Sequence, residues 1–157
     1  MKYVNYYSSP VGKITMISDG KMIERIFMNG QKYVRVNGVL KRQKLPVFDV
    51  LTSWFDDYFN GNVPSMKVPL KMVGTEFQKR VWEELLNVPY GKTTTYGQIA
   101  INLGLGKNYS RAVASAAGHN PFLIIVPCHR VIGQNGKLTG FAAGLEVKER
   151  LLKIEGK

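Results

Sequence analysis

The stretch TTTYGQIAINLGLGKNYSRAVASAAGHN, residues 93–120, has the pattern of two short helices in the second half of the chain. Thr95 is a suitable N-cap for a first helix, and Gln98 follows it by three residues, as in a capping box. After a short glycine-containing turn, Asn108 is a suitable N-cap for a second helix, which ends at Gly118. Two short helices around such a turn indicate a helix-turn-helix, although an αα-hairpin without a binding role has the same pattern.

The second of these helices is unusual for a protein that recognises a DNA sequence. Recognition helices in the major groove carry Arg, Asn or Gln to reach base edges, whereas this helix is small on nearly every face. Small residues let a helix approach another helix, or the floor of a DNA groove. Only Arg111, in the first turn, could insert deeply, so the pattern predicts DNA binding of low sequence specificity. The small residues are Ala112, Val113, Ala114, Ser115, Ala116, Ala117 and Gly118.

The composition is that of a globular protein with an excess of positive charge. Apolar residues make up 45% of the 157 residues and charged residues 21%, which suits one ordinary domain or two small ones. The formal net charge of +11 favours a polyanionic partner, most often nucleic acid, although charge also serves solubility.

The chain has a single cysteine, so it cannot form an internal disulfide and needs no oxidising compartment. The N-terminal stretch MKYVNYYSSP lacks the apolar core of a signal peptide, and no apolar run approaches the length that spans a membrane. We therefore expect a cytoplasmic protein without membrane contact, associated with the nucleoid if the source is prokaryotic.

The first forty residues have the pattern of short strands joined by turns. KITMIS (13–18) and MIERIFM (22–28) are separated by an Asp19–Gly20 turn signal. A second turn signal, Asn29–Gly30, precedes QKYVRV (31–36). These segments predict a small antiparallel sheet.

Helical patterns follow the sheet. Residues 46–61 have apolar side chains at helical spacing, and residues 62–70, with two prolines and no periodicity, resemble a linker. Thr75, with Gln78 three residues later, caps a further helix, and residues 145–156 form the last one. The apolar positions of the first two helices are Val47, Val50, Leu51, Trp54 and Tyr58, and Phe77, Val81, Trp82, Leu85 and Leu86.

The sequence therefore predicts an α+β protein. A small N-terminal antiparallel sheet plus helix forms a supporting domain over residues 1–68, with a linker to about residue 73. A mainly helical domain with the helix-turn-helix occupies residues 74–157.

Cys128 lies in IIVPCHRVIG, residues 124–133, directly after an apolar run. A lone buried cysteine is usually inert. Here Pro127 suits a shaped turn, and His129 and Arg130 suit a thiolate, which needs a nearby base or cation. Neighbours in an extended strand point to opposite faces, so contact between Cys128 and His129 requires a turn or a bridging water.

Glu155 is a third candidate for this site. It follows Leu151 by four residues and Leu152 by three, so it shares their face of the last helix. If that helix packs against the cysteine turn, Glu155 can hold His129 in a Cys–His–Glu relay; alternatively, it is solvated near the C-terminus. We expect no metal site. The candidate ligands Cys128, His119 and His129 do not have the spacing that is usual for zinc.

PCHRVIG, preceded by HNPFLIIV and followed by LTGFAAGLEVKERLL, closely resembles the O6-alkylguanine-DNA alkyltransferases. The resemblance covers about residues 74 to 155 and includes VPYGKTTTYGQIA and RAVASAAGHNP. The N-terminal part is similar to the family only in size and in its order of strands and helix.

The resemblance implies an irreversible DNA repair reaction that each molecule performs once and without a cofactor. The alkyl group of O6-alkylguanine in duplex DNA, and more weakly that of O4-alkylthymine, moves to Cys128. His129 removes the thiol proton through a water, and Glu155 orients His129. The family binds the minor groove, flips the damaged base and acts mostly as a monomer.

The resemblance also implies roles for residues around the thiol. Arg111 fills the gap left by the flipped base, Tyr96 helps to move the nucleotide and donates to guanine N3, and Asn120 ties the helix-turn-helix to the cysteine turn. The remaining DNA contacts are Ala112, Ser115 and Ala116, and the pocket residues are Pro127, Val131, Phe141 and Ala142.

Two pocket positions depart from the family pattern. Phe141 stands where many members have tyrosine, and Ala142 where some have serine. The backbone N–H of Ala142 can still donate to O6, and the carbonyls of Cys128 and Val131 can accept from the exocyclic amine of guanine. We expect an apolar pocket that tolerates alkyl groups larger than methyl.

Two other functions fit parts of the sequence. A damage sensor of this family lacks the acceptor cysteine, and Cys128 is present. A cysteine hydrolase could use Cys128, His129 and Glu155, but it would turn over, whereas an alkyl acceptor reacts once.

Overall fold

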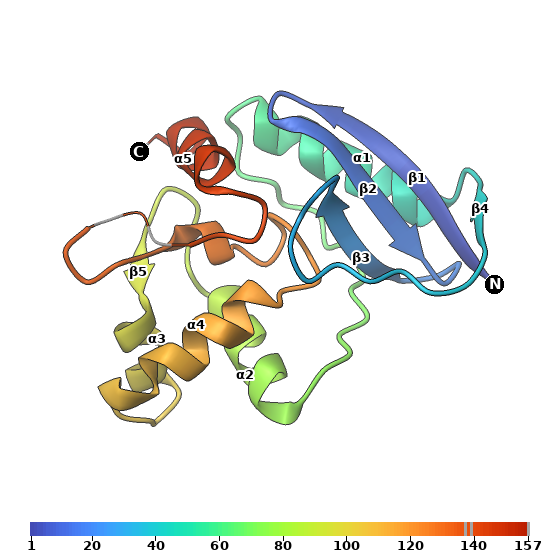
Figure 1. The fold of residues 1–157 in the computed structure, drawn as a ribbon. Coiled ribbons are helices and arrows are strands. Elements are labelled where there is room, and N and C mark those ends of the chain that lie inside the picture. The colour runs from blue at the N-terminus through green and yellow to red at the C-terminus, as the bar shows by residue number, and fades with distance from the viewer. Residues whose placement is uncertain (137, 139, 157) are drawn as a thin grey trace.

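The computed structural model describes every residue except 137, 139 and 157, and has the predicted α+β architecture (Figure 1). Strands β1 (Lys2–Ser9), β2 (Gly12–Ser18) and β3 (Ile23–Met28) are antiparallel, and the short β4 (Leu40–Arg42) lies parallel to β1 at the edge. The strand order is β3-β2-β1-β4, and helix α1 (Pro46–Phe59) lies across one face of the sheet.

The contact between sheet and helix follows from the alternation of the strands. Tyr7, which pairs with Ile14 across β1 and β2, packs its ring against Phe55 and Phe59 of α1, with centroids 5.1 and 6.0 Å apart. Its hydroxyl donates to Asp56 Oδ1 at 2.7 Å. Alternate residues of the strands therefore face α1 and build the apolar core there.

The expected strand over residues 31–36 is wrong. This segment leaves the sheet, and Tyr33 adopts a left-handed backbone conformation with φ of 63°, which a strand does not allow. The Lys32 N–H donates 3.1 Å to the carbonyl of Ala142 instead of to β3. The sheet is also not purely antiparallel, since its fourth strand, β4, pairs in parallel.

The second half contains α2 (Glu76–Leu85), α3 (Tyr96–Asn102), α4 (Ser110–Gly118) and α5 (Leu145–Ile154). The predicted capping box at the start of α2 is present, with Thr75 and Gln78 bonded reciprocally at 3.0 Å. Thr95 caps α3 by accepting from the Gln98 N–H at 3.1 Å. The prediction that Asn108 caps α4 is wrong, because a 3₁₀ turn at Lys107–Tyr109 already precedes this helix.

The edge of β3 that faces away from β2 ties the N-terminal sheet to the rest of the chain. The Ile23 N–H donates to Pro69 at 2.8 Å, and Ile26 exchanges hydrogen bonds with Pro121 and Leu123 just after α4. Buried side chains form one apolar cluster that includes residues of both halves. The sheet therefore supports the segment that leads to Cys128.

Within the described residues, no helix is both long and apolar enough to cross a membrane.

Candidate active site

Cys128 begins a 3₁₀ turn, Cys128–Arg130, that Asn120 holds in place. Asn120 Nδ2 donates to the carbonyl of Val126 at 2.7 Å, and its Oδ1 accepts from the Phe122 N–H at 2.8 Å. The same Nδ2 lies 3.3 Å from Cys128 Sγ. This buried amide therefore connects the end of α4 to the cysteine turn. The resemblance to the family implied the same position for Asn120.

His129 and Glu155 form a buried pair behind the thiol. His129 Nε2 lies 2.5 Å from Glu155 Oε2, and both side chains are inaccessible to solvent. The alternative of a solvated Glu155 is therefore wrong. The other carboxylate oxygen, Oε1, accepts from Arg130 Nε at 2.7 Å and from the Gly91 N–H at 3.2 Å.

Another buried group, Tyr58 of α1, contacts this pair from the N-terminal part of the chain. Its hydroxyl donates to Glu155 Oε2 at 2.5 Å and lies 3.3 Å from His129 Nε2. Helical spacing identified Tyr58 only as an apolar core position, because nothing in the sequence links it to a residue 97 positions away.

The hydrogen bonds of His129 determine which nitrogen can act as a base. Nε2 faces the carboxylate and therefore carries the proton. Nδ1 is buried and has no hydrogen-bond partner among the described residues. Among the described residues, no hydrogen bond joins Cys128 directly to His129. A proton therefore passes between them only through a bridging group.

The environment keeps the resting thiol and imidazole neutral. Burial raises the pKa of the Cys128 thiol, and the Asn120 hydrogen bond and the nearby Lys148 oppose that rise. Burial lowers the pKa of His129, and Glu155 opposes this change. At neutral pH the site therefore holds a protonated thiol beside an unprotonated base, which is the starting state for general-base activation.

Glu155 itself remains ionised. Burial alone would raise its pKa, but hydrogen bonds from His129, Arg130 and Tyr58 outweigh burial and lower the pKa from 4.5 to about 2. An ionised carboxylate at this point stabilises the imidazolium that forms when His129 accepts a proton.

Lys148 is a buried cation that the sequence interpretation missed. It lies on α5 with no exposed surface, and burial lowers its pKa while Cys128 raises it. Its position, three residues before Leu151 and seven before Glu155, puts it on the same face of the helix. That spacing was the signal that could have identified it.

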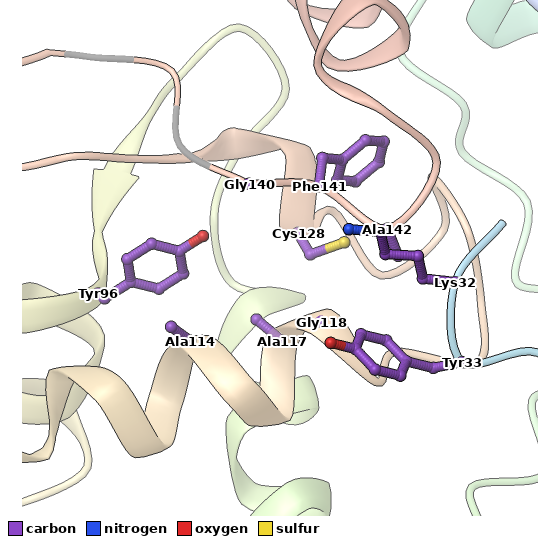
Figure 2. Close-up of a pocket in the computed structure, with 10 residues that line it drawn as sticks. All are labelled: Lys32, Tyr33, Tyr96, Ala114, Ala117, Gly118, Cys128, Gly140, Phe141 and Ala142. Atoms are coloured by element: carbon purple, nitrogen blue, oxygen red, sulfur yellow. The ribbon is translucent and has the colours of Figure 1, made fainter.

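Cys128 borders a cavity of about 270 Å³ between the helix-turn-helix, the cysteine turn and the loop before α5. Figure 2 shows the thiol directed into this space, with Tyr96 across it and Phe141 above it. Lys32 and Tyr33 reach it from the N-terminal part of the chain. The cavity is lined by Lys32, Tyr33, Tyr96, Ala114, Ala117, Gly118, Cys128, Gly140, Phe141 and Ala142.

Two family models match this chain and together cover nearly all of it. Residues 2–72 match the ribonuclease-like domain of 6-O-methylguanine DNA methyltransferase, and residues 76–157 match its DNA binding domain.

The chain belongs to the 6-O-methylguanine DNA methyltransferase family.

Named relatives of this methyltransferase are similar over most of their length. The methylated-DNA–protein-cysteine methyltransferase of Methanosarcina acetivorans is 46% identical, with 98% of each chain covered. The Haemophilus influenzae protein of the same name is 42% identical over 98% of this chain and 86% of its own. Among solved structures, Mycobacterium tuberculosis OGT in complex with DNA superposes with a TM-score of 0.89 at 39% identity, covering 98% of this chain and 92% of that one.

The methyltransferase does not place all the predicted DNA contacts on its surface. Arg111, Ala112 and Ser115 are exposed on α4. Ala116 is 3% exposed, and its carbonyl accepts from Trp82 Nε1 at 2.9 Å, so its side chain lies in the core against α2. The Ala116 side chain therefore faces away from the surface of α4, and a contact of Ala116 with DNA stays a prediction.

The predicted pocket is also only partly the one observed. Phe141, Ala142 and Tyr96 line the cavity with Cys128. Pro127 and Val131 are buried beside the turn and do not line it; Val131 instead begins β6 (Val131–Ile132), which pairs in parallel with β5 (Thr94–Thr95). The sequence missed the other lining residues, which are Lys32, Tyr33, Ala114, Ala117, Gly118 and Gly140.

The described residues contain no cluster of three His, Cys, Asp or Glu side chains that could hold a metal ion.

Proposed function

We propose that this methyltransferase repairs duplex DNA by moving the alkyl group of O6-alkylguanine to Cys128, once per molecule. The observation that carries the proposal is the Cys128 thiol on a cavity, backed by the buried His129–Glu155 pair. A thioether on sulfur is not reversed by thiol exchange, and the chain has no second cysteine. The acceptor is therefore consumed in the reaction.

The transfer is a substitution at the alkyl carbon. His129 Nδ1 takes the thiol proton through a bridging water, while Glu155 stabilises the resulting imidazolium. The sulfur forms a bond to carbon as the bond from carbon to O6 breaks, and that electron pair stays on the purine. Tyr96, on the cavity wall, eases this departure by donating to guanine N3, and the purine finally gains the proton that the thiol lost.

Backbone groups around the cavity select guanine. The carbonyls of Cys128 and Val131 accept from its exocyclic amine, and the Ala142 N–H donates to O6; Val131, whose side chain lies outside the cavity, takes part through its backbone alone. Thymine has no such amine, so O4-alkylthymine loses these contacts and reacts more slowly.

The cavity also supports the proposal that the damaged base is flipped out of the duplex. A base inside a duplex cannot reach a thiol within a cavity, so the damaged nucleotide must leave the stack. The exposed small residues Ala112 and Ser115 let α4 lie close to the minor groove, and Arg111 fills the gap in the stack. The net charge of +11 supports phosphate contacts, and we expect the protein to act as a monomer.

Titration of a duplex that carries one O6-methylguanine tests this function on the DNA side. Increasing amounts of protein are added, the DNA is digested to nucleosides, and the remaining O6-methyl-2′-deoxyguanosine is quantified. We expect one lesion repaired per protein and none with Cys128→Ala, which should still bind the duplex. Continued repair beyond one equivalent would contradict the proposal and favour a hydrolase.

A further inference from the structure

Among the residues that the structure describes, Tyr58 is the one hydroxyl that reaches the buried charge pair from the N-terminal part of the chain. It lies on α1 with no exposed surface. Its oxygen contacts Glu155 Oε2 at 2.5 Å and lies 3.3 Å from His129 Nε2. The two residues with which the transfer mechanism activates Cys128 therefore both adjoin this one hydroxyl.

The core does not need this hydroxyl for packing. The Tyr58 ring stacks on Trp54, with centroids 5.4 Å apart, and meets the Tyr90 ring edge-on at 5.8 Å. A phenylalanine ring would make the same contacts. A buried hydroxyl is unfavourable unless it is hydrogen-bonded, and this one is directed at a carboxylate.

Glu155 is held by four donors, two on each oxygen. Oε1 accepts from Arg130 and from the Gly91 backbone, whereas Oε2 accepts from Tyr58 and faces His129. Tyr58 and His129 thus share one oxygen. The Tyr58 hydroxyl both fixes that oxygen and draws on its negative charge.

We propose that Tyr58 is a positioning residue for alkyl transfer, whose hydroxyl holds Glu155 so that His129 presents Nδ1 toward Cys128. This inference rests on the proposed function. It also gives the N-terminal sheet and helix a part in the reaction, because α1 supplies a group that the DNA-binding half lacks.

Removal of the hydroxyl has two consequences with defined directions. Without the Tyr58 hydrogen bond, the negative charge on Oε2 attracts the His129 imidazolium more strongly, so the pKa of His129 rises. His129 then acts as a base only at a higher pH than in the wild-type protein. The carboxylate also loses a restraint, so fewer His129 conformations are productive. The charged and titratable groups around His129 are Tyr58, Cys128, Arg130, Lys148 and Glu155.

Tyr58→Phe tests the inference through the pH dependence of a single turnover. The rate constant of transfer is measured with saturating lesion-containing duplex over the range in which histidines titrate. We expect the midpoint of the acid limb to rise by about half a unit to one unit, and the plateau rate constant to fall by about tenfold. DNA affinity should be unchanged.

Tyr7→Phe is the matched control. Tyr7 also packs on α1 and donates to a carboxylate, Asp56 at 2.7 Å, but on the sheet side of the helix. Loss of that bond should affect α1 stability without shifting the pH profile. A shift of equal size in both variants would show a general effect of loosening α1 and overturn the proposal.

A second readout does not depend on DNA. The His129 ring is titrated by NMR in the wild-type protein and in Tyr58→Phe, and its pKa should be higher in the variant. If wild-type protein transfers the alkyl group while Tyr58→Phe matches it in rate, midpoint and His129 titration, Tyr58 has no positioning role. If wild-type protein transfers nothing, the proposed function itself fails.

Discussion

At the scale of single residues, the reactivity of Cys128 depends on its partners more than on its own ionisation. Burial raises the pKa of the thiol, so the resting sulfur is protonated and a poor nucleophile. In the proposed reaction, the neutral His129, paired with an ionised Glu155, removes that proton when the substrate is in place.

Phe141 tests how the cavity selects its alkyl group. It lines the cavity and meets the His129 ring edge-on, with centroids 6.4 Å apart. In Phe141→Tyr, an added hydroxyl takes space and favours polar surroundings, so transfer of a benzyl group should slow several-fold relative to methyl. The measurement is the ratio of single-turnover rates on the two adducts. An unchanged ratio would remove any special role for Phe141.

At the scale of secondary-structure elements, the loop between α2 and α3 holds Glu155 through one glycine. Gly91 has a φ of 78°, and a Cβ there would lie 3.3 Å from the backbone oxygen of Glu155. Gly91→Ala should cost about 1–2 kcal/mol for the left-handed backbone alone. Displacement of Glu155 should add to this cost and slow alkyl transfer.

The control for this change is Gly61→Ala. Gly61 has a similar φ of 81°, but nothing lies within 4 Å of its added Cβ. Both variants should lose stability in denaturant unfolding, and only Gly91→Ala should lose transfer rate. Equal transfer rates in the two would show that the Gly91 contact does not position the carboxylate.

Local signals in the sequence predict the elements better than their contacts. The caps at Thr75 and Thr95 are local devices, and both are confirmed. The segment over 31–36 looked like a strand because its apolar pattern is local, whereas its route toward Ala142 depends on a contact across the molecule. Ala116 was expected to contact DNA because nearly every side chain on α4 is small, and only the fold shows which face of the helix is buried.

The same limit applies to the site. The resemblance to a family predicted that Cys128, His129 and Glu155 form one site. The position of Glu155 on the buried face of the last helix supported that prediction. Tyr58 and Lys32 come from the N-terminal part, where apolar periodicity and basic charge are uninformative about a remote partner.

At the scale of the whole molecule, the buried pair should make folding sensitive to acid. The folded protein resists protonation of His129, whose pKa is lowered by burial, and of Glu155, whose pKa falls to about 2. The unfolded chain therefore binds more protons, and stability decreases as the pH falls. The loss begins below the ordinary His value of 6.5, and the Glu155 contribution, complete above 4.5, disappears toward pH 2.

Denaturant unfolding at several pH values measures this effect. The Glu155 contribution should be about 3 kcal/mol between its two limits. Glu155→Gln should be less stable at neutral pH, because buried Arg130 loses its charged partner, and its stability should vary less between pH 4.5 and pH 2. The same steepness in both proteins would show that other carboxylates dominate.

In the proposed reaction, Cys128 accepts one alkyl group and keeps it. The mass of the intact protein tests this proposal. The protein is mixed with an excess of duplex carrying one O6-methylguanine, and its mass is measured before and after. We predict a gain of one methylene, CH₃ replacing H, that saturates at one per molecule and maps to Cys128 in peptide analysis. A protein of unchanged mass, whether or not the lesion disappears, would contradict the account.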